Sequence, residues 1–218
     1  SRVDQSGGST ASLRPMAGFD DSLVREYFEM NGFFVRQSRK YAVQSRRKRA
    51  DEEGDLLVIN PSPRRGGETP FQLFSSDLPG LSAAVVAVKA WHSTKAITPT
   101  MIKKGDLLEF VRKEAVEAAK EAFADLTPTE GQPLAKVLVL PGIPATEPQR
   151  SESITLLRDS GVDHVLTFRT ILENLVQAVE SNQSYAKSDT LQLLRLLRVY
   201  DMVKAAQLEL FGSANPPK

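Results

Sequence analysis

Two polar residues, Asp55 and Lys89, are the side chains of this sequence best placed to do chemistry together, because each belongs to a short apolar run. Asp55 opens the run at 54–60 (Gly-Asp-Leu-Leu-Val-Ile-Asn), and Lys89 lies in the run at 85–92 (Val-Val-Ala-Val-Lys-Ala-Trp-His). Short apolar runs of this kind are typical of buried strands. An acid and an amine on adjacent strands can meet at one point of a sheet edge, and with a metal ion such a pair can cleave a phosphodiester bond.

Both residues also have ordinary structural explanations. An aspartate after a glycine commonly begins a strand, and a lysine at the end of a strand commonly reaches into solvent. A third alternative joins the two, since Asp55 and Lys89 could form an ion pair whose net contribution to stability need not be large.

The composition limits the classes of protein to be considered. The chain has 218 residues, of which 41% are hydrophobic and 25% charged, enough for one sizeable core. A formal net charge of +1 argues against a globally basic nucleic-acid binder but leaves local patches open. The absence of cysteine excludes disulfides and thiolate chemistry. No apolar run approaches the about 18 residues of a membrane span, so we expect a cytoplasmic protein without a membrane partner.

The first half of the chain divides at about residue 18. Residues 1–18 are mostly polar and rich in glycine and serine, which predicts a flexible leader, and residues 19–218 are predicted to form a single α/β domain. Apolar residues then recur at helical spacing from Asp21, with Asp20 or Asp21 as the cap and Asn31-Gly32 as the stop. A short strand is expected at 33–37.

Strands and helices alternate in the rest of the chain, which predicts a mixed or mostly parallel central sheet with helices on both faces. The run at 84–90 is apolar without alternation and is therefore expected to be a central strand, whereas the proline- and glycine-rich segment 61–80 is expected to be a loop. We also expect a capping box at 146–149 that opens a helix ending at Gly161. The other expected elements are a helix at 107–123, strands at 136–140 and 164–168, and helices at 171–179 and 189–200.

The order helix, strand, Asp-led strand, strand ending in Lys, helix, strand resembles the restriction-endonuclease-like, or PD-(D/E)xK, nuclease superfamily over about residues 20–140. The matching pieces are Ser-Leu-Val-Arg-Glu-Tyr-Phe-Glu-Met-Asn-Gly-Phe-Phe-Val-Arg at 22–36, Gly-Asp-Leu-Leu-Val-Ile-Asn-Pro at 54–61 and Val-Ala-Val-Lys-Ala-Trp-His at 86–92. The resemblance implies a restriction-endonuclease-like core, with the last helices as a C-terminal extension.

The resemblance also implies roles for individual residues. Asp55 and the backbone carbonyl of Val88 would hold Mg²⁺, because a hard cation takes oxygen ligands. Lys89 would help to polarise the attacking water, and Glu26 or Glu29 would supply an auxiliary acid from the helix before the first strand.

The chain departs from the family pattern at Ala87, which stands where the family has a glutamate, two residues before Lys89. Alanine supplies no ligand, so Mg²⁺ would be bound weakly or not at all unless another acid takes this place. Flanking acids that could do so are Glu52, Glu53, Glu68 and Asp77.

A basic segment offers a surface for nucleic acid, with DNA as the first expectation. Between residues 36 and 49 the chain carries seven basic residues and no acid, and each cation near a phosphate adds a salt-sensitive increment of affinity. The alternative is an ordinary solvated loop. The residues that we expect to contact phosphate are Arg39, Lys40, Arg46, Arg47, Lys48 and Arg49.

Two classes of function therefore stay open. The first is a nucleic-acid-binding, nuclease-like protein, either a divergent Mg²⁺-dependent nuclease or a catalytically inactive relative. The second is an inactive scaffold that acts as a protein-interaction module and self-associates through the leucine-rich segment 189–200 and Leu208–Phe211. On the same last helix, Arg195 and Arg198 could bind phosphate or a partner, or be ordinary surface residues.

Overall fold

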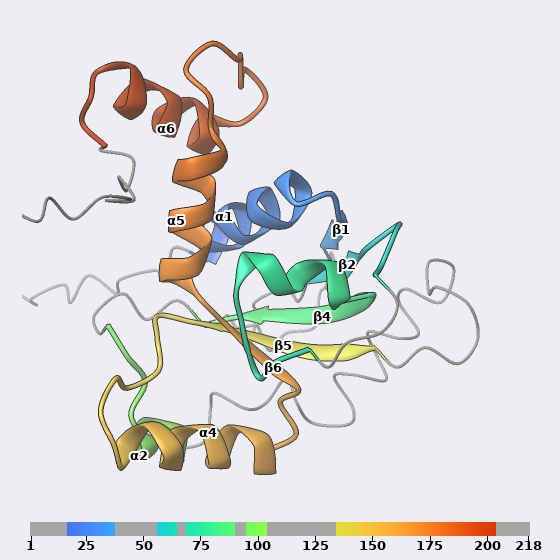
Figure 1. The fold of residues 1–218 in the computed structure, drawn as a ribbon, viewed down its shortest axis with the longest axis vertical. Coiled ribbons are helices and arrows are strands. Elements are labelled where there is room, and N and C mark those ends of the chain that lie inside the picture. Colours follow the sequence, from blue (N-terminus) through green and yellow to red (C-terminus); the bar gives the residue numbers. More distant parts are fainter. Residues whose placement is uncertain (1–16, 38–55, 65–68, 90–94, 104–133, 204–218) are drawn as a thin grey trace, which may run out of the picture.

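The described part of the chain forms a mixed sheet with helices on both faces, which confirms the α/β class (Figure 1). The computed structural model describes residues 17–37, 56–64, 69–89, 95–103 and 134–203. Within these ranges the sheet has six strands in the order β1-β2-β4-β5-β6-β3. The strands are β1 (Phe34–Gln37), β2 (Leu56–Ile59), β3 (Gln72–Leu73), β4 (Ala83–Val88), β5 (Ala135–Leu140) and β6 (His164–Thr167).

The strand directions bring several strand ends to one edge of the sheet. β2 is antiparallel to both β1 and β4, whereas β4, β5, β6 and β3 run parallel to one another. Consequently β1, β4, β5 and β6 all end at the edge where β2 begins. We name this edge the carboxyl edge.

Helices pack against both faces of the sheet. α1 and α5 lie on one face, and α2 and α4 lie on the other (Figure 1). α6 follows α5 away from the sheet. The helices are α1 (Ala17–Met30), α2 (Pro99–Lys103), α4 (Gln149–Asp159), α5 (Phe168–Ala178) and α6 (Asp189–Val199), with the 3₁₀ helix η1 at Ser75–Gly80.

β4 is the central strand that the sequence predicts. All six of its residues are buried, because they lie between β2 and β5 and under a helical layer on each face. Val86 and Val88 pack in the same core cluster as Tyr27 and Phe28 of α1. Ala87 packs in the opposite cluster, with Leu138 of β5 and Leu157 of α4.

The N-terminal helix begins earlier than the sequence indicates. α1 starts at Ala17, so residues 17 and 18 of the expected leader are helical, and the other leader residues lie outside the described part. Asp20 and Asp21 are therefore inside the first turns and neither is the cap. Gly32 ends the turn after α1 as expected, with a φ of 84° that suits glycine.

Two further expectations need correction, and one helix was not foreseen. Segment 61–80 is not all loop, because it contains β3, which pairs with β6, and η1, where Asp77 Oδ2 accepts the backbone N–H of Phe74 at 2.8 Å. α2 was not expected. The capping box is also wrong: Pro148 is the N-cap of α4 and makes no side-chain bond. The expected helix at 107–123 lies outside the described residues.

A carboxylate next to the start of α4 takes over part of that capping role. Glu147 Oε2 accepts from the backbone N–H of Ser151 at 3.1 Å and from its hydroxyl at 2.6 Å. These hydrogen bonds favour the ionised acid and lower the pKa of Glu147.

Arg198 of α6 closes the C-terminus of α5. Its guanidinium donates to the carbonyl oxygens of Val176 at 3.2 Å, Gln177 at 3.2 Å and Val179 at 2.7 Å. The last carbonyls of a helix have no partner within the helix, and a cation there also interacts favourably with the helix dipole. Arg198 therefore has a structural role in joining α6 to α5, and Arg195 adds a bond to the Ser181 carbonyl at 3.0 Å.

We predict that Arg198→Ala lowers the free energy of unfolding by about 2 kcal/mol, because it leaves carbonyl groups without their charged donor. The measurement is chemical denaturation of the purified protein. Arg169→Ala is the matched control, since Arg169 makes an exposed i,i+4 pair with Glu173 at 2.7 Å, worth at most about 0.5 kcal/mol. Equal losses from both substitutions would contradict the capping role.

Candidate functional site

The carboxyl edge gathers the strand ends on which the predicted chemistry depends. Leu56, the first residue of β2, pairs with Val86 of β4. Asp55 directly precedes Leu56 in the chain but itself lies outside the described residues. On the other strand Lys89 follows the end of β4, and its backbone N–H donates to the Val139 carbonyl of β5 at 2.9 Å.

The backbone direction of β4 sets where the Val88 carbonyl points. Successive residues of a strand direct their backbone polar groups to opposite neighbours. Since Lys89 bonds toward β5, the carbonyl of Val88 is directed toward the β2 side, beyond Leu56. The Val88 side chain is buried on the α1 face.

Ala87 occupies an apolar environment. Its side chain is 3% exposed and belongs to the core cluster that also contains Ile97, Ile102 and Leu138. By strand alternation Lys89 follows Ala87 onto the same face of the sheet, and it is only half-buried. Position 87, where the resembled family has a glutamate, thus lies at the border between the core and the end of β4.

The two α1 acids that the resemblance implies lie away from the carboxyl edge. Glu29 is near the end of α1, next to the turn at Gly32 that leads into the start of β1. Its Oε1 accepts from Arg25 Nε at 2.8 Å, and this pair raises the pKa of Arg25. Glu26 is half-buried and lies about 4.5 Å closer to the start of the helix.

Asp20 and Asp21 are the α1 acids at the carboxyl edge. Both are nearly buried, at 6% and 8% exposure. Asp21 Oδ2 accepts a hydrogen bond of 3.2 Å from Gln37 Nε2, and Gln37 is the last residue of β1 and pairs with Leu56. The positive end of the helix dipole favours carboxylates in this first part of α1.

The sequence analysis missed this acidic pair because it expected Asp20 or Asp21 to be the helix cap. A helix that begins four residues earlier puts both of them on helical turns, where they can be buried against the sheet. The sequence carries no clear signal of this burial, because aspartate side chains are usually at the surface.

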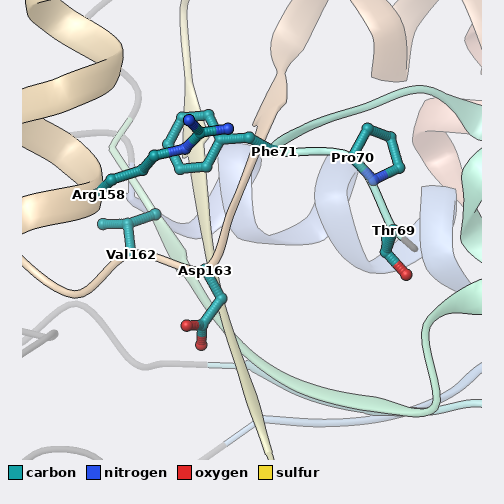
Figure 2. Close-up of a pocket in the computed structure, with 6 residues that line it drawn as sticks. All are labelled: Thr69, Pro70, Phe71, Arg158, Val162 and Asp163. Atoms are coloured by element: carbon teal, nitrogen blue, oxygen red, sulfur yellow. The ribbon is translucent and has the colours of Figure 1, made fainter.

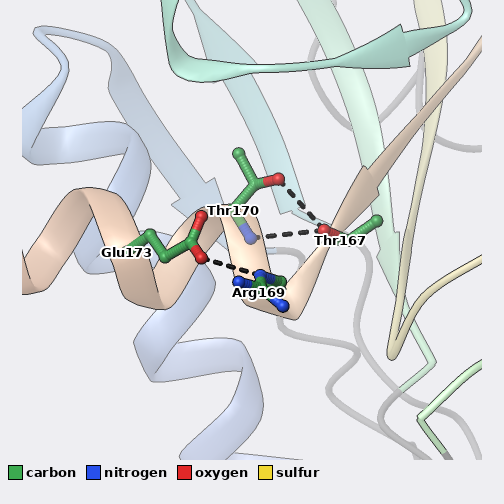
Figure 3. Close-up of polar contacts among 4 residues, drawn as sticks. All are labelled: Thr167, Arg169, Thr170 and Glu173. Carbon is green, nitrogen blue, oxygen red and sulfur yellow. Dashed lines mark hydrogen bonds and ion pairs between the residues drawn. The ribbon is translucent and has the colours of Figure 1, made fainter. Parts of the chain in front are cut away.

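α5 also begins at the carboxyl edge, directly after β6 (Figure 3). Thr167 caps the helix, because its hydroxyl oxygen accepts the Thr170 N–H at 3.2 Å and lies 3.0 Å from the Thr170 hydroxyl. Arg169 points to Glu173 one turn along, with Nε 2.7 Å from Oε1. These contacts hold the start of the helix in place.

The remaining sequence-based candidates are only partly located. All six expected phosphate contacts of the basic segment, and the flanking acids Glu52, Glu53 and Glu68, lie outside the described residues. Asp77 is used within η1 by the backbone N–H of Phe74. His164, for which the sequence offers no partner, has Nδ1 2.9 Å from the carbonyl oxygen of Pro70. In the described ranges no three or more His, Cys, Asp or Glu side chains form a metal-binding group.

Comparison of the chain with protein-family models, with curated proteins and with solved structures finds no match. Within the described ranges, no helix combines the length and apolar character required to cross a membrane.

Proposed function

We propose that this protein is a metal-dependent, restriction-endonuclease-like nuclease that acts on DNA at the carboxyl edge. The observation that carries the proposal is the arrangement of β1, β2, β4 and β5 after α1. Two antiparallel pairings are followed by a parallel one, and the strand in the third position ends in Lys89. The order of these elements is the one on which the resemblance in the sequence is based, and the strand pairing adds that the starts and ends that matter lie at one edge.

A rearranged set of acids compensates for Ala87 in this proposal. Asp55 and the Val88 carbonyl retain the roles that the resemblance implies, and Asp21 supplies the second carboxylate from the α1 face. Because Ala87 and Lys89 lie on the opposite face, the metal ion would lie beyond the ends of the strands. The buried position of Asp21 and its hydrogen bond to Gln37 support this role, because metal-binding carboxylates are commonly oriented by a second hydrogen-bonding group. Asp20 is the reserve ligand, and Glu26 and Glu29 are not needed.

Oxygen donors of this kind suit Mg²⁺ or Mn²⁺, which when bound would stabilise the charge that develops on the scissile phosphate. In the proposal the chain contributes the other parts of the reaction. Asp55 and Asp21 would hold the cation against the phosphate, Lys89 would donate a hydrogen bond to the attacking water, and Gln37 fixes the Asp21 carboxylate. In the proposal the basic segment at 36–49 contacts the DNA phosphates on either side of the cleaved bond. These local cations are needed because a net charge of +1 gives the whole protein little attraction for DNA.

We predict that Asp21→Asn lowers metal-dependent cleavage by at least about 100-fold, because a neutral amide binds the metal ion more weakly than a carboxylate does. The assay incubates labelled single-stranded, duplex and branched DNA with the protein in Mn²⁺ or in EDTA. Asp55→Ala should abolish the same activity. Glu29→Gln is the matched control and should retain cleavage, since Glu29 is paired with Arg25.

If Asp21→Asn retains cleavage and Glu29→Gln loses it, the auxiliary acid is Glu29 and not Asp21. A complete lack of cleavage by the unaltered protein with every DNA and in Mn²⁺ would overturn the nuclease proposal itself. A DNA mobility shift without cleavage would identify an inactive relative that has kept binding.

Position 87 offers a second test of the site. Ala87→Glu places a carboxylate next to Ile97 and Ile102, and in EDTA we expect a loss of about 3 kcal/mol of stability because that acid is buried without a partner. In Mn²⁺ the restored ligand set should recover much of this loss and raise cleavage. Thermal unfolding with and without metal measures the effect.

Ala87→Gln is the matched control for this test, because it has nearly the same size and no charge. It should be destabilised to a similar extent and gain nothing from Mn²⁺. Equal responses of the two variants to Mn²⁺ would mean that position 87 does not face a metal site.

A second function, a protein-interaction module, is favoured by a surface on the last helix. Several large apolar side chains of α6 and the residues that follow it are exposed, and surfaces of this kind often mark contacts with proteins. Self-association is the form of this function that the leucine-rich sequence suggests. The residues of this C-terminal patch are Leu193, Leu196, Val199, Tyr200 and Met202.

If the C-terminal patch joins two copies, the double variant Leu193→Glu/Leu196→Glu should convert a dimer into a monomer, because the charges would be buried without partners. Light scattering after gel filtration measures the mass over a range of protein concentrations. Gln192→Glu adds a charge to the same helix outside the patch and should leave the dimer intact. A monomer for the unaltered chain at every concentration would rule out this association.

A further inference from the structure

A groove of about 790 Å³ lies on the opposite side of the sheet from the carboxyl edge, where β3 and β6 begin (Figure 2). This volume is within the range of small-molecule binding sites. The four residues of β6, at about 3.3 Å each, separate it from the carboxyl edge by about 13 Å. The groove is lined by Thr69, Pro70, Phe71, Arg158, Val162 and Asp163.

A stacked pair of side chains forms one wall of the groove. The guanidinium of Arg158, at the end of α4, lies over the ring of Phe71 with its central carbon 4.7 Å from the ring centroid. Phe71 is half-buried against the core cluster that includes Val162 and Val165, so the ring is a fixed base for the cation. Among the residues that the structure describes, this ring is the partner recorded for the Arg158 guanidinium, whose N–H groups are available to a ligand.

The other polar groups of the groove are held in position by the backbone. Asp163 Oδ2 accepts the Lys136 N–H at 2.8 Å and lies 3.9 Å from the Lys136 ammonium. The recorded bonds of Asp163 within the described ranges use this one oxygen, so Oδ1 can accept a further donor. Pro70 is fixed by the contact of its carbonyl with His164. The groove thus offers a flat cation, an acceptor and an apolar floor at Val162.

We propose that this groove binds one nucleotide unit of a single-stranded nucleic acid. The base stacks on the outer face of the Arg158 guanidinium, which single-stranded nucleic acids use as a stacking surface much as they use aromatic rings. The edge of the guanidinium donates to the adjacent phosphate, and Asp163 Oδ1 accepts an amino group of the base. The inference rests on the proposed function, in which this protein acts on DNA. It deepens that function by naming an unpaired strand as part of the substrate.

An ordinary surface explanation exists and gives a different expectation. Arginine–aromatic pairs at exposed positions are common and modestly stabilising without any ligand. In that case removal of the charge at position 158 would weaken nucleic-acid binding no more than removal of any other exposed arginine. The two explanations therefore differ in binding measurements rather than in stability.

The test is the fluorescence anisotropy of a short labelled single-stranded oligonucleotide, measured in EDTA so that cleavage plays no part. Arg158→Gln should weaken binding about tenfold, because it removes both the stacking surface and the charge. Arg169→Gln is the matched control, an exposed arginine at the other edge, and should change binding less than twofold. Phe71→Leu keeps the apolar volume, removes the ring beneath the guanidinium and should weaken binding in the same direction.

Separate probes identify the source of the nucleotide. A duplex of the same sequence should bind Arg158→Gln and Arg169→Gln equally well, whereas a selective loss with duplex would overturn the single-strand assignment. A nucleoside monophosphate that binds the unaltered protein and not Arg158→Gln would assign the groove to free nucleotides and overturn the strand. Equal oligonucleotide affinities of Arg158→Gln and Arg169→Gln would overturn the groove altogether.

The groove proposal and the nuclease proposal can be tested separately. Asp21→Asn removes a residue of the carboxyl edge and should leave oligonucleotide binding in EDTA unchanged, so loss of cleavage with retained binding would separate the two proposals. Because position 158 is exposed, Arg158→Gln is not expected to affect folding, and its thermal unfolding should match that of the unaltered protein.

Discussion

The burial of β4 on both faces is the constraint on which the rest of the structure depends. Six consecutive residues of this strand have no exposed side chain, since α1 and α5 cover one face and α2 and α4 the other. A strand that is apolar throughout can carry chemistry only at its ends, where it leaves the helical layers. Lys89 is the first polar residue after β4, and this explains why the reactive groups of the proposal gather at the carboxyl edge.

The same burial explains why the acid at position 87 can be absent. A carboxylate among Ile97, Ile102 and Leu138 would be strongly disfavoured unless a metal ion neutralised it. The first turns of α1 avoid part of this cost, because the helix dipole and the Gln37 amide both stabilise a buried carboxylate at Asp21. Moving an acidic ligand from the strand to the helix would thus keep the charge at the edge while it relieves the core.

The sequence predicts the strands well and the long-range contacts poorly, for a physical reason. Apolar runs such as 84–90 identify a buried strand because burial acts on each residue separately. By contrast, β3 has only two residues, and it is a strand because it pairs with β6. Arg198 likewise caps carbonyls that are 19 to 22 residues away in the chain. In the candidate site, Asp55 and Lys89 were identifiable from strand ends, whereas Asp21 depends on where α1 begins and on its contact with Gln37.

Because the chain is nearly neutral, local contacts such as those of the proposed groove must supply the affinity for nucleic acid. With 28 basic and 27 acidic residues, the chain has little general attraction for phosphate, so affinity must come from local contacts. Phosphate contacts weaken steeply with salt because they depend on counterion release, whereas stacking on the Arg158–Phe71 pair is largely insensitive to it. A protein of this charge therefore needs short-range recognition if it is to hold a single strand at the salt concentration of a cell.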